Sequence, residues 1–103
     1  MHSVRQLARI TVAAAGTRQQ VSSTRIIASS VLIQADHDNT GKIYVGDSAV
    51  SATRTLAVLE AGESVEIDSE VFNGRGQQYD LSQIYVDASV SADKVRVGYT
   101  EET

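Results

Sequence analysis

The sequence predicts an all-β protein: a single antiparallel β-sandwich or jelly-roll-like small barrel of six to eight strands. Apolar and polar residues alternate with a period of two along most of the chain, as in strands with one buried face. Clusters of Gly, Asn, Asp and Ser recur about every 8 to 12 residues, which is typical of turns between short strands. The 103 residues suffice for one domain, 1–103, with a single core.

The first strand is predicted over residues 4–12, within an N-terminal strand or arm, residues 1–15, that can contact a neighbouring molecule. Its apolar face holds Val4, Ala8, Ile10 and Val12, and its polar face holds Arg5, Arg9 and Thr11. The apolar stretch around residues 10–15 is too short for a signal peptide because Arg9 interrupts it.

A central strand is predicted within residues 25–34. The continuous apolar run Val31-Leu32-Ile33 is typical of a strand covered on both faces. Clean alternation then predicts four further strands, at 42–45, 64–68, 83–87 and 94–99. The similar triplets Ile43-Tyr44-Val45 and Ile84-Tyr85-Val86 indicate similar strands on equivalent sheets, with Tyr44 and Tyr85 pointing away from the core.

Turn-forming residues separate these strands. A hairpin turn is expected at 36–41, a turn before the strand at 64–68, a longer loop at 73–76 and a short turn at 91–93. Residues 47–60 are ambiguous, because the spacing of their Ala and Leu residues also fits a short helix. Their Ser and Thr content and the missing caps favour a loop that leads into a strand.

Charge is distributed unevenly along the chain. The first 35 residues contain four arginines and no acid, so they carry +4, whereas the rest carries −8 and the whole chain −4. These arginines are Arg5, Arg9, Arg18 and Arg25. Either they form a basic edge that meets an acidic edge, of the same molecule or of a neighbour, or they are solvated strand residues, some of them paired within the monomer. Four scattered arginines on an acidic protein do not form the cluster of positive charge that a phosphate backbone needs, so nucleic-acid binding is not expected.

The most site-like segment is Asp36-His37-Asp38-Asn39-Thr40-Gly41. Together with Asp47 it loosely resembles a calcium loop, with acids at the first, third and twelfth positions and Gly at the sixth. Because Thr40 holds the fifth position and no flanking helices are visible, a plain turn is the better interpretation. His37 lies between two acids, but no G-x-S-x-G motif supplies a nucleophile. Two His and no Cys cannot build a transition-metal centre, and neither a cofactor nor a metal is expected.

Carboxylates and tyrosines complete the set of candidates. Four glutamates fall near one predicted strand, where they keep the surface soluble: Glu60, Glu63, Glu66 and Glu70. Tyr44, Tyr79 and Tyr85 either form an exposed aromatic surface for a sugar or protein partner or cover a sheet face. With no reactive constellation in view, binding or assembly is the expected activity.

Several segments, in their order, resemble small virion proteins of tailed bacteriophages. They are Thr24-Arg25-Ile26-Ile27, Ser30-Val31-Leu32-Ile33-Gln34, Gly41-Lys42-Ile43-Tyr44-Val45-Gly46-Asp47, Leu59-Glu60-Ala61-Gly62-Glu63-Ser64-Val65-Glu66-Ile67 and Gln83-Ile84-Tyr85-Val86-Asp87-Ala88. In those proteins a strand is followed by an I-x-V-G-x-x-x-V loop, an A-G-E-S-V strand and an I-Y-V-x-A strand. The resemblance spans residues 20–100, with departures in the Ala-rich loop after Val50 and the longer segment at 72–80.

The resemblance implies a non-enzymatic capsid decoration or cement protein on the virion surface. Its partners would be the major capsid protein or another virion protein, within a homodimer or homotrimer, and neither a membrane nor a nucleic acid. The partner-binding residues would be Arg5, Arg9, Arg18, Tyr44 and Tyr85. The alternative is a tail-associated carbohydrate- or receptor-binding module that uses the tyrosines or the loop at 73–79. A metal-free cupin-like enzyme with His37 as its base is a third possibility.

Overall fold

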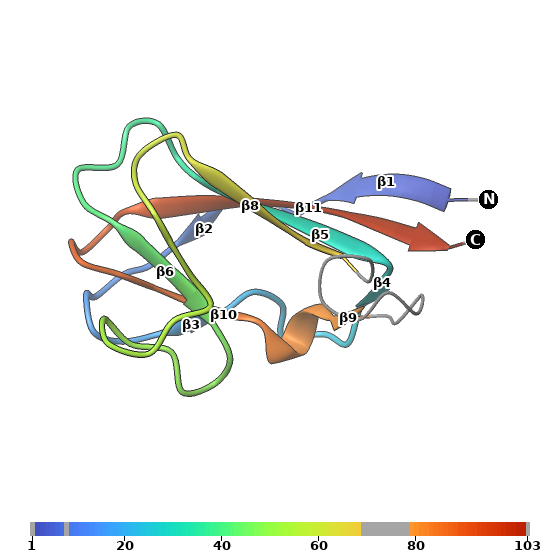
Figure 1. The fold of residues 1–103 in the computed structure, drawn as a ribbon, viewed down its shortest axis with the longest axis horizontal. Coiled ribbons are helices and arrows are strands. Elements are labelled where there is room, and N and C mark those ends of the chain that lie inside the picture. The colour runs from blue at the N-terminus through green and yellow to red at the C-terminus, as the bar shows by residue number, and fades with distance from the viewer. Residues whose placement is uncertain (1, 8, 69–78, 103) are drawn as a thin grey trace.

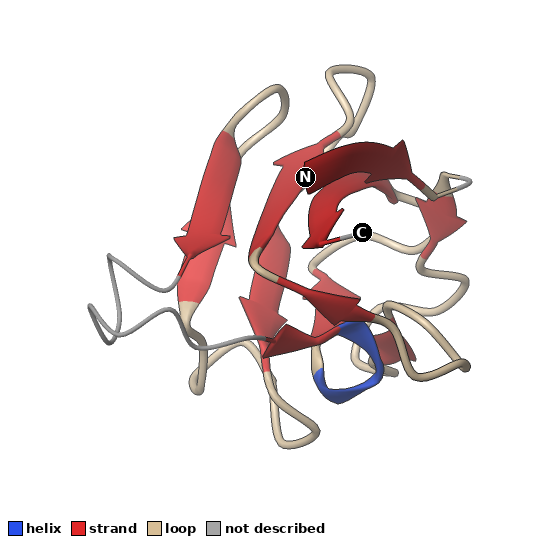
Figure 2. Ribbon diagram, turned by 90° about the vertical axis from the view of Figure 1, so that its right-hand side faces the viewer, coloured by secondary structure: helices blue, strands red, loops and turns tan. Residues whose placement is uncertain are grey.

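The computed structural model describes residues 2–7, 9–68 and 79–102. These residues form eleven β-strands and one short 3₁₀ helix, and every strand pairing is antiparallel (Figures 1 and 2). The all-β class is therefore confirmed. The strands outnumber the six to eight expected because several are pieces of only two residues.

The larger sheet has five strands. Its order is β1 (His2–Gln6), β11 (Lys94–Glu102), β5 (Ser30–Ala35) and β8 (Ser64–Asp68), and β2 (Ile10–Thr11) also pairs with β11. The two chain ends run side by side in it, since His2 pairs with Glu102. In Figure 1 the ribbon of β1 and β11 projects at one end of the molecule.

The second sheet has four strands, in the order β3 (Gln19–Gln20), β10 (Tyr85–Ala88), β6 (Ile43–Gly46) and β7 (Ala57–Leu59). A third, two-stranded pairing joins β4 (Ile27–Ala28) to β9 (Tyr79–Asp80). The 3₁₀ helix, η1 (Leu81–Gln83), follows β9, and the carboxylate of Asp80 caps it by accepting hydrogen bonds from the amide and hydroxyl of Ser82.

One hydrophobic core lies between the two main sheets. The larger sheet contributes Val31, Ile33, Ala35, Ile67, Val95 and Val97, and the smaller sheet contributes Ile43, Val45, Leu59, Val86 and Ala88. These residues alternate with outward-facing ones along their strands, as the period of two predicts. Within the described ranges both sheets keep open edges, so the arrangement is sandwich-like and not a closed barrel.

The turns predicted as hairpins mostly carry the chain from one sheet to the other. Residues 36–42 connect β5 to β6, residues 60–63 connect β7 to β8, and residues 89–93 connect β10 to β11. The prediction of a hairpin turn at 36–41 is therefore wrong, because β5 and β6 belong to different sheets. Turn residues indicate that the chain reverses, but they do not indicate which sheet receives the next strand.

The ambiguous stretch at 47–60 is a loop that leads into strand β7, as preferred, and it closes the hairpin between β6 and β7. β6 and β10, which carry the similar triplets, are neighbours in one sheet and do not lie on equivalent sheets. The loop at 73–76, Glu70 and the segment at 72–78 lie outside the described residues.

The N-terminal strand predicted at 4–12 is divided. Gln6 pairs with Gly98 and Ile10 with Val95, so four steps along the N-terminal segment oppose three steps along β11. The register against β11 therefore shifts by one residue between Gln6 and Ile10, as it does at a β-bulge, and this shift reverses the alternation. As a result Ile10 packs against the core while Val4 is 85% exposed, and the prediction of one shared apolar face is wrong for Val4.

Strand β5 is central in the larger sheet, between β11 and β8, as predicted. Its two faces differ, however. Ile33 is fully buried, whereas Leu32 is 46% exposed on the outer face of the sheet. The continuous apolar run therefore does not indicate a strand covered on both faces.

Candidate functional site

Three of the four N-terminal arginines are paired within the monomer. The Nε of Arg5 lies 2.9 Å from Glu101 Oε1, and the Nε of Arg25 lies 3.5 Å from Asp80 Oδ2. Arg9 contacts Asp36 and Arg18 is exposed beside β3. The arginines therefore lie on separate parts of the surface and do not form one basic edge. Among these four, Arg9 contacts a buried acid.

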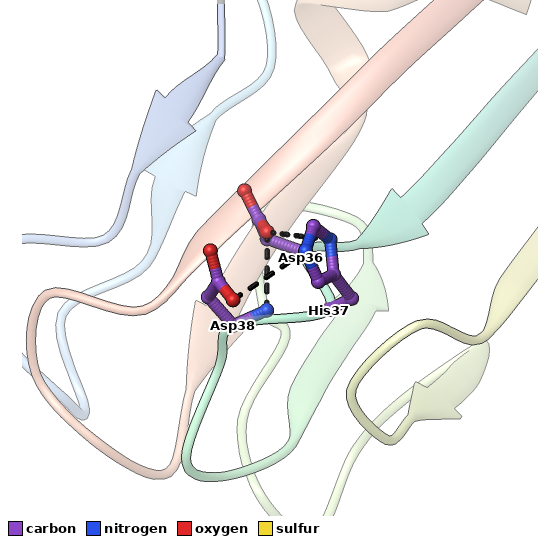
Figure 3. Close-up of side chains that lie close together, drawn as sticks. All are labelled: Asp36, His37 and Asp38. Carbon is purple, nitrogen blue, oxygen red and sulfur yellow. Dashed lines mark hydrogen bonds and ion pairs between the residues drawn. The ribbon is translucent and has the colours of Figure 1, made fainter.

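Asp36 is the centre of a charged cluster at the end of β5 (Figure 3). Its side chain is 1% exposed, and its Oδ2 lies 3.1 Å from Arg9 Nη1 and 3.8 Å from Arg96 Nε. Its Oδ1 accepts a hydrogen bond from the amide of Asp38 at 3.2 Å and lies 3.5 Å from His37 Nδ1. A buried carboxylate is thus compensated by two arginines from opposite ends of the chain.

The surroundings of Asp36 favour its ionised form. The hydrogen bond from the Asp38 amide lowers the pKa of Asp36 below its ordinary value of 3.8, and the positive charges of Arg9 and Arg96 lower it further. Burial acts in the opposite direction without reversing the shift. Asp36 is therefore a fixed negative charge beneath the two guanidinium groups.

Asp36, His37 and Asp38 are the candidate metal ligands among the described residues, with one ligand atom of each within 4.8 Å of the others. His37 Nε2 lies 3.4 Å from Asp38 Oδ1, and both side chains are exposed. A cation here would meet the positive charges of Arg9 and Arg96 across the Asp36 carboxylate, which disfavours binding. The calcium-loop pattern fails in addition, because Asp47 lies at the opposite end of β6.

The other buried acids hold loops together. The Asp93 carboxylate accepts hydrogen bonds from the amides of Thr40 and Gly41, at 3.2 and 2.8 Å. The side chain of Asn39 both donates to the carbonyl of Lys94 and accepts from its amide, each at 2.8 Å. The segment at 36–42 is thereby fixed against the turn that precedes β11. The remaining site-like residues of the predicted loop thus serve the fold.

A further buried acid performs the same role on the second sheet. Asp87 accepts a hydrogen bond from the amide of Gly16 at 3.0 Å, which draws the loop after β2 over the outer face of β10. Among the glutamates, Glu63 accepts from the amide of Glu60 within a turn, and Glu66 is exposed on β8.

Tyr44 and Tyr85 lie on the outer face of the second sheet, as predicted, and both are half-buried. Tyr44 pairs with Asp87 and Tyr85 with Gly46, so the two rings are diagonal neighbours on adjacent strands. Tyr79 is separate from them, because it lies on β9 and packs against the core.

Among the residues that the structure describes, no strand pairs with the outer edge of β1, so this open edge presents backbone groups that have no partner strand. Leu7 donates to the carbonyl of Val97 at 3.0 Å, which fixes the hydrogen-bonding phase of the strand. In an antiparallel pair this phase turns the backbone groups of alternate residues toward the partner. Those of Arg5 and Ser3 therefore point toward β11, and those of Val4 and Gln6 point away from the sheet.

Three residues at the β1 edge and on the outer face of the larger sheet, Val4, Arg96 and Gly98, do not follow from the sequence pattern. Alternation predicts Val4 on the buried face, because the register shift between Gln6 and Ile10 has no local signal in the sequence. Arg96 and Gly98 come from the C-terminal strand, and they meet Arg9 and Gln6 only through the register of β1, β2 and β11. The alternation in residues 94–99 could have placed Arg96 and Gly98 on one outer face, but not beside Arg9.

Comparisons with known proteins identify no relative: no family model, no curated protein and no solved structure matches the chain. No helix in the described part of the chain has the length and apolar character needed to cross a bilayer. Functional inference accordingly depends on the surface of the two sheets and on the sequence motifs.

Proposed function

We propose that this chain is a non-enzymatic structural protein of a tailed bacteriophage, a capsid decoration or cement protein that binds the assembled shell and stabilises it. The sequence motifs that resemble small virion proteins motivate this proposal. The buried carboxylates of Asp87 and Asp93 hold loops against the two sheets through hydrogen bonds. A protein with such fixed loops suits a role in which it must keep its shape on the shell surface.

The observation that carries the proposal is the open edge of β1. Val4 is 85% exposed there, and its backbone N–H and C=O point away from β11. An extended segment of a capsid subunit can add to such an edge through main-chain hydrogen bonds.

The mechanism is thermodynamic linkage. A protein that binds only the assembled shell stabilises it by its binding free energy, which is about 2.7 kcal/mol per site when the free protein is at a hundred times its Kd. Because a shell offers many equivalent sites, the effect on disassembly is large even when each contact is modest.

Co-sedimentation with empty shells of the virus that encodes the chain tests the proposal. The wild-type chain should pellet with the shells at a saturable ratio and raise their melting temperature. Val4→Pro removes an N–H that has no partner in the sheet, so it should leave the fold intact and weaken shell binding. Val4→Thr, which keeps the N–H, is the control. Absence of saturable binding by the wild-type chain would overturn the proposal.

Arg5, Arg9 and Arg18 are the arginines proposed to contact the shell. Glutamate replacements of the first two would place an acid beside Glu101 or Asp36 and destabilise the fold itself. Glutamine replacements remove the charge without that repulsion and are the better test. Unchanged shell binding of the triple glutamine variant would remove the arginines from the contact.

A tail-associated carbohydrate-binding module is the second candidate. It is supported by a depression of about 640 Å³ next to Tyr44, whose lining includes Asn39, Thr40, Lys42 and Glu60. An aromatic ring beside amide, hydroxyl and charged groups suits a sugar. Glycan-array binding that Tyr44→Ala abolishes would favour this function over shell decoration.

A further inference from the structure

A groove crosses the outer face of the larger sheet at Gly98. Gly98 pairs with Gln6 on one side and with Leu32 on the other. Because Gly98 has no side chain, its backbone forms the bottom of the groove between these two residues. The groove has a volume of about 370 Å³, and Gln34, Arg9 and Arg96 complete its polar lining. The described lining residues include two arginines and no acid, and the acid on the neighbouring strand β8 is Glu66, which pairs with Leu32 and is exposed.

Both guanidinium groups keep hydrogen-bonding capacity. Arg9 and Arg96 are 49% and 52% exposed, and both approach the same oxygen of Asp36. A guanidinium has five N–H donors, and these contacts use one nitrogen of each group. The groove therefore presents two positive charges to solvent, and the buried carboxylate of Asp36 compensates only one of them.

We propose that this groove binds the carboxylate side chain of an acidic protein segment. The carboxylate would accept charge-assisted hydrogen bonds from Arg9 and Arg96, and the segment would lie over Gly98 in contact with Leu32. That the partner is a shell protein rests on the proposed function. The inference adds to that function that the contacting residue of the shell protein is an exposed Asp or Glu.

A carboxylate fits better than a nucleic acid. Two arginines in one groove match one or two carboxylates, whereas a phosphate polymer needs a continuous row of cations. The neighbouring Leu32 also gives the groove an apolar wall that suits the stem of a glutamate side chain.

Gly98 allows a test that keeps both arginines. A Cβ added there meets the carbonyl oxygen of Arg5 at 3.6 Å, an ordinary contact, so Gly98→Val should fill the groove without disturbing the strand. A β-branched residue is also favoured over Gly inside a strand. Arg96→Gln removes one donor group, and Arg54→Gln, on the exposed loop before β7, is the matched charge control.

The measurement is titration of the full chain with a six-residue glutamate peptide, followed by NMR shifts, with a glutamine peptide, inorganic phosphate and a single-stranded DNA as comparison ligands. Wild type should bind the glutamate peptide with shifts at Gly98 and Leu32. Arg96→Gln should weaken binding about five- to tenfold because one charge-assisted contact is lost. Gly98→Val should weaken binding by a similar factor, about five- to tenfold, because its side chain occupies the space that the bound segment needs and holds the carboxylate away from the arginines. Arg54→Gln should change it less than twofold.

Four results would overturn the assignment: no binding of the glutamate peptide, no effect of Gly98→Val in a variant that melts like wild type, an equal effect of Arg54→Gln, or tighter binding of phosphate or DNA at Gly98. Failure of the proposed function is recognised separately. Peptide binding without shell binding refutes decoration and leaves the groove in place, whereas shell binding that Gly98→Val leaves unchanged refutes only the groove.

Discussion

Truncation of two adjacent residues of β5 tests how the larger sheet faces the core. Ile33 is fully buried in the cluster shared by both sheets, and Leu32 is 46% exposed on the outer face. Ile33→Ala leaves a cavity and should cost about 2–5 kcal/mol of unfolding free energy. Complete burial of a leucine is worth about 1.5–3 kcal/mol, and Leu32 is only half-buried. Leu32→Ala should therefore cost about 0.5–1 kcal/mol.

Urea unfolding followed by far-ultraviolet circular dichroism measures both free energies. For a domain of this size each kcal/mol corresponds to about 4–8 °C in melting temperature. The Ile33 variant should therefore melt at least about 8 °C below wild type and the Leu32 variant no more than about 8 °C below it. Equal losses at the two positions would refute the orientation of the strand, because a strand covered on both faces predicts that result.

Three further predictions concern the loops and the buried acids. The folded-state pKa values of Asp36 and Asp80 are lowered from 3.8, so their contribution to stability is complete above that pH and is lost as the pH falls through the lower folded values. Urea unfolding from about pH 6 down to about pH 2 should show this loss, with a smaller slope for Asp36→Asn; an unchanged slope would contradict the role of Asp36. Asp93→Ala deprives two backbone amides of their acceptor and should lower the unfolding free energy by about 1–3 kcal/mol in the same assay. A decrease below the experimental error would show that water replaces the carboxylate. Gly41→Ala would drive its Cβ into the side chains of Ser89 and Val90 and should lower the unfolding free energy by about 1–3 kcal/mol, a prediction that a variant as stable as wild type in calorimetry would contradict.

The period of two identified most strands because it depends only on which side of a strand is buried. Residues 42–45 and 64–68 each overlap an observed strand, and the first turns Ile43 and Val45 inward. The same pattern contains no information about pairing partners. It could not reveal that the three predicted turns within the described residues, at 36–41, 61–63 and 91–93, carry the chain from one sheet to the other, since such turns use the same residue types as hairpin turns.

The register shift between Gln6 and Ile10 shows why an alternating pattern can mislead. A shift of one residue reverses every later side chain, so Val4 and Ile10, which have the same parity, lie on opposite faces. Only the register against β11 reveals this reversal.

Part of the candidate site was within reach of the sequence. The outward placement of Tyr44 and Tyr85 followed from alternation, and the turn-forming residues at 36–41 predicted that the chain reverses there, although not that it passes to the other sheet. The burial of Asp36, Asp87 and Asp93 was not predictable, because it depends on groups that only the fold brings together. Arg9 and Arg96 come to Asp36 from opposite ends of the chain, and amides of distant loops donate to Asp87 and Asp93. The groove at Gly98 likewise requires three strands in register.

Electron cryomicroscopy of shells incubated with the protein tests shell decoration most directly. We expect ordered density of one small β-sandwich on the outer shell surface, with the β1 edge and the groove at Gly98 against a capsid subunit. Bare shells at saturating protein, or bound molecules whose β1 edge and groove both face solvent, would contradict the proposed contact.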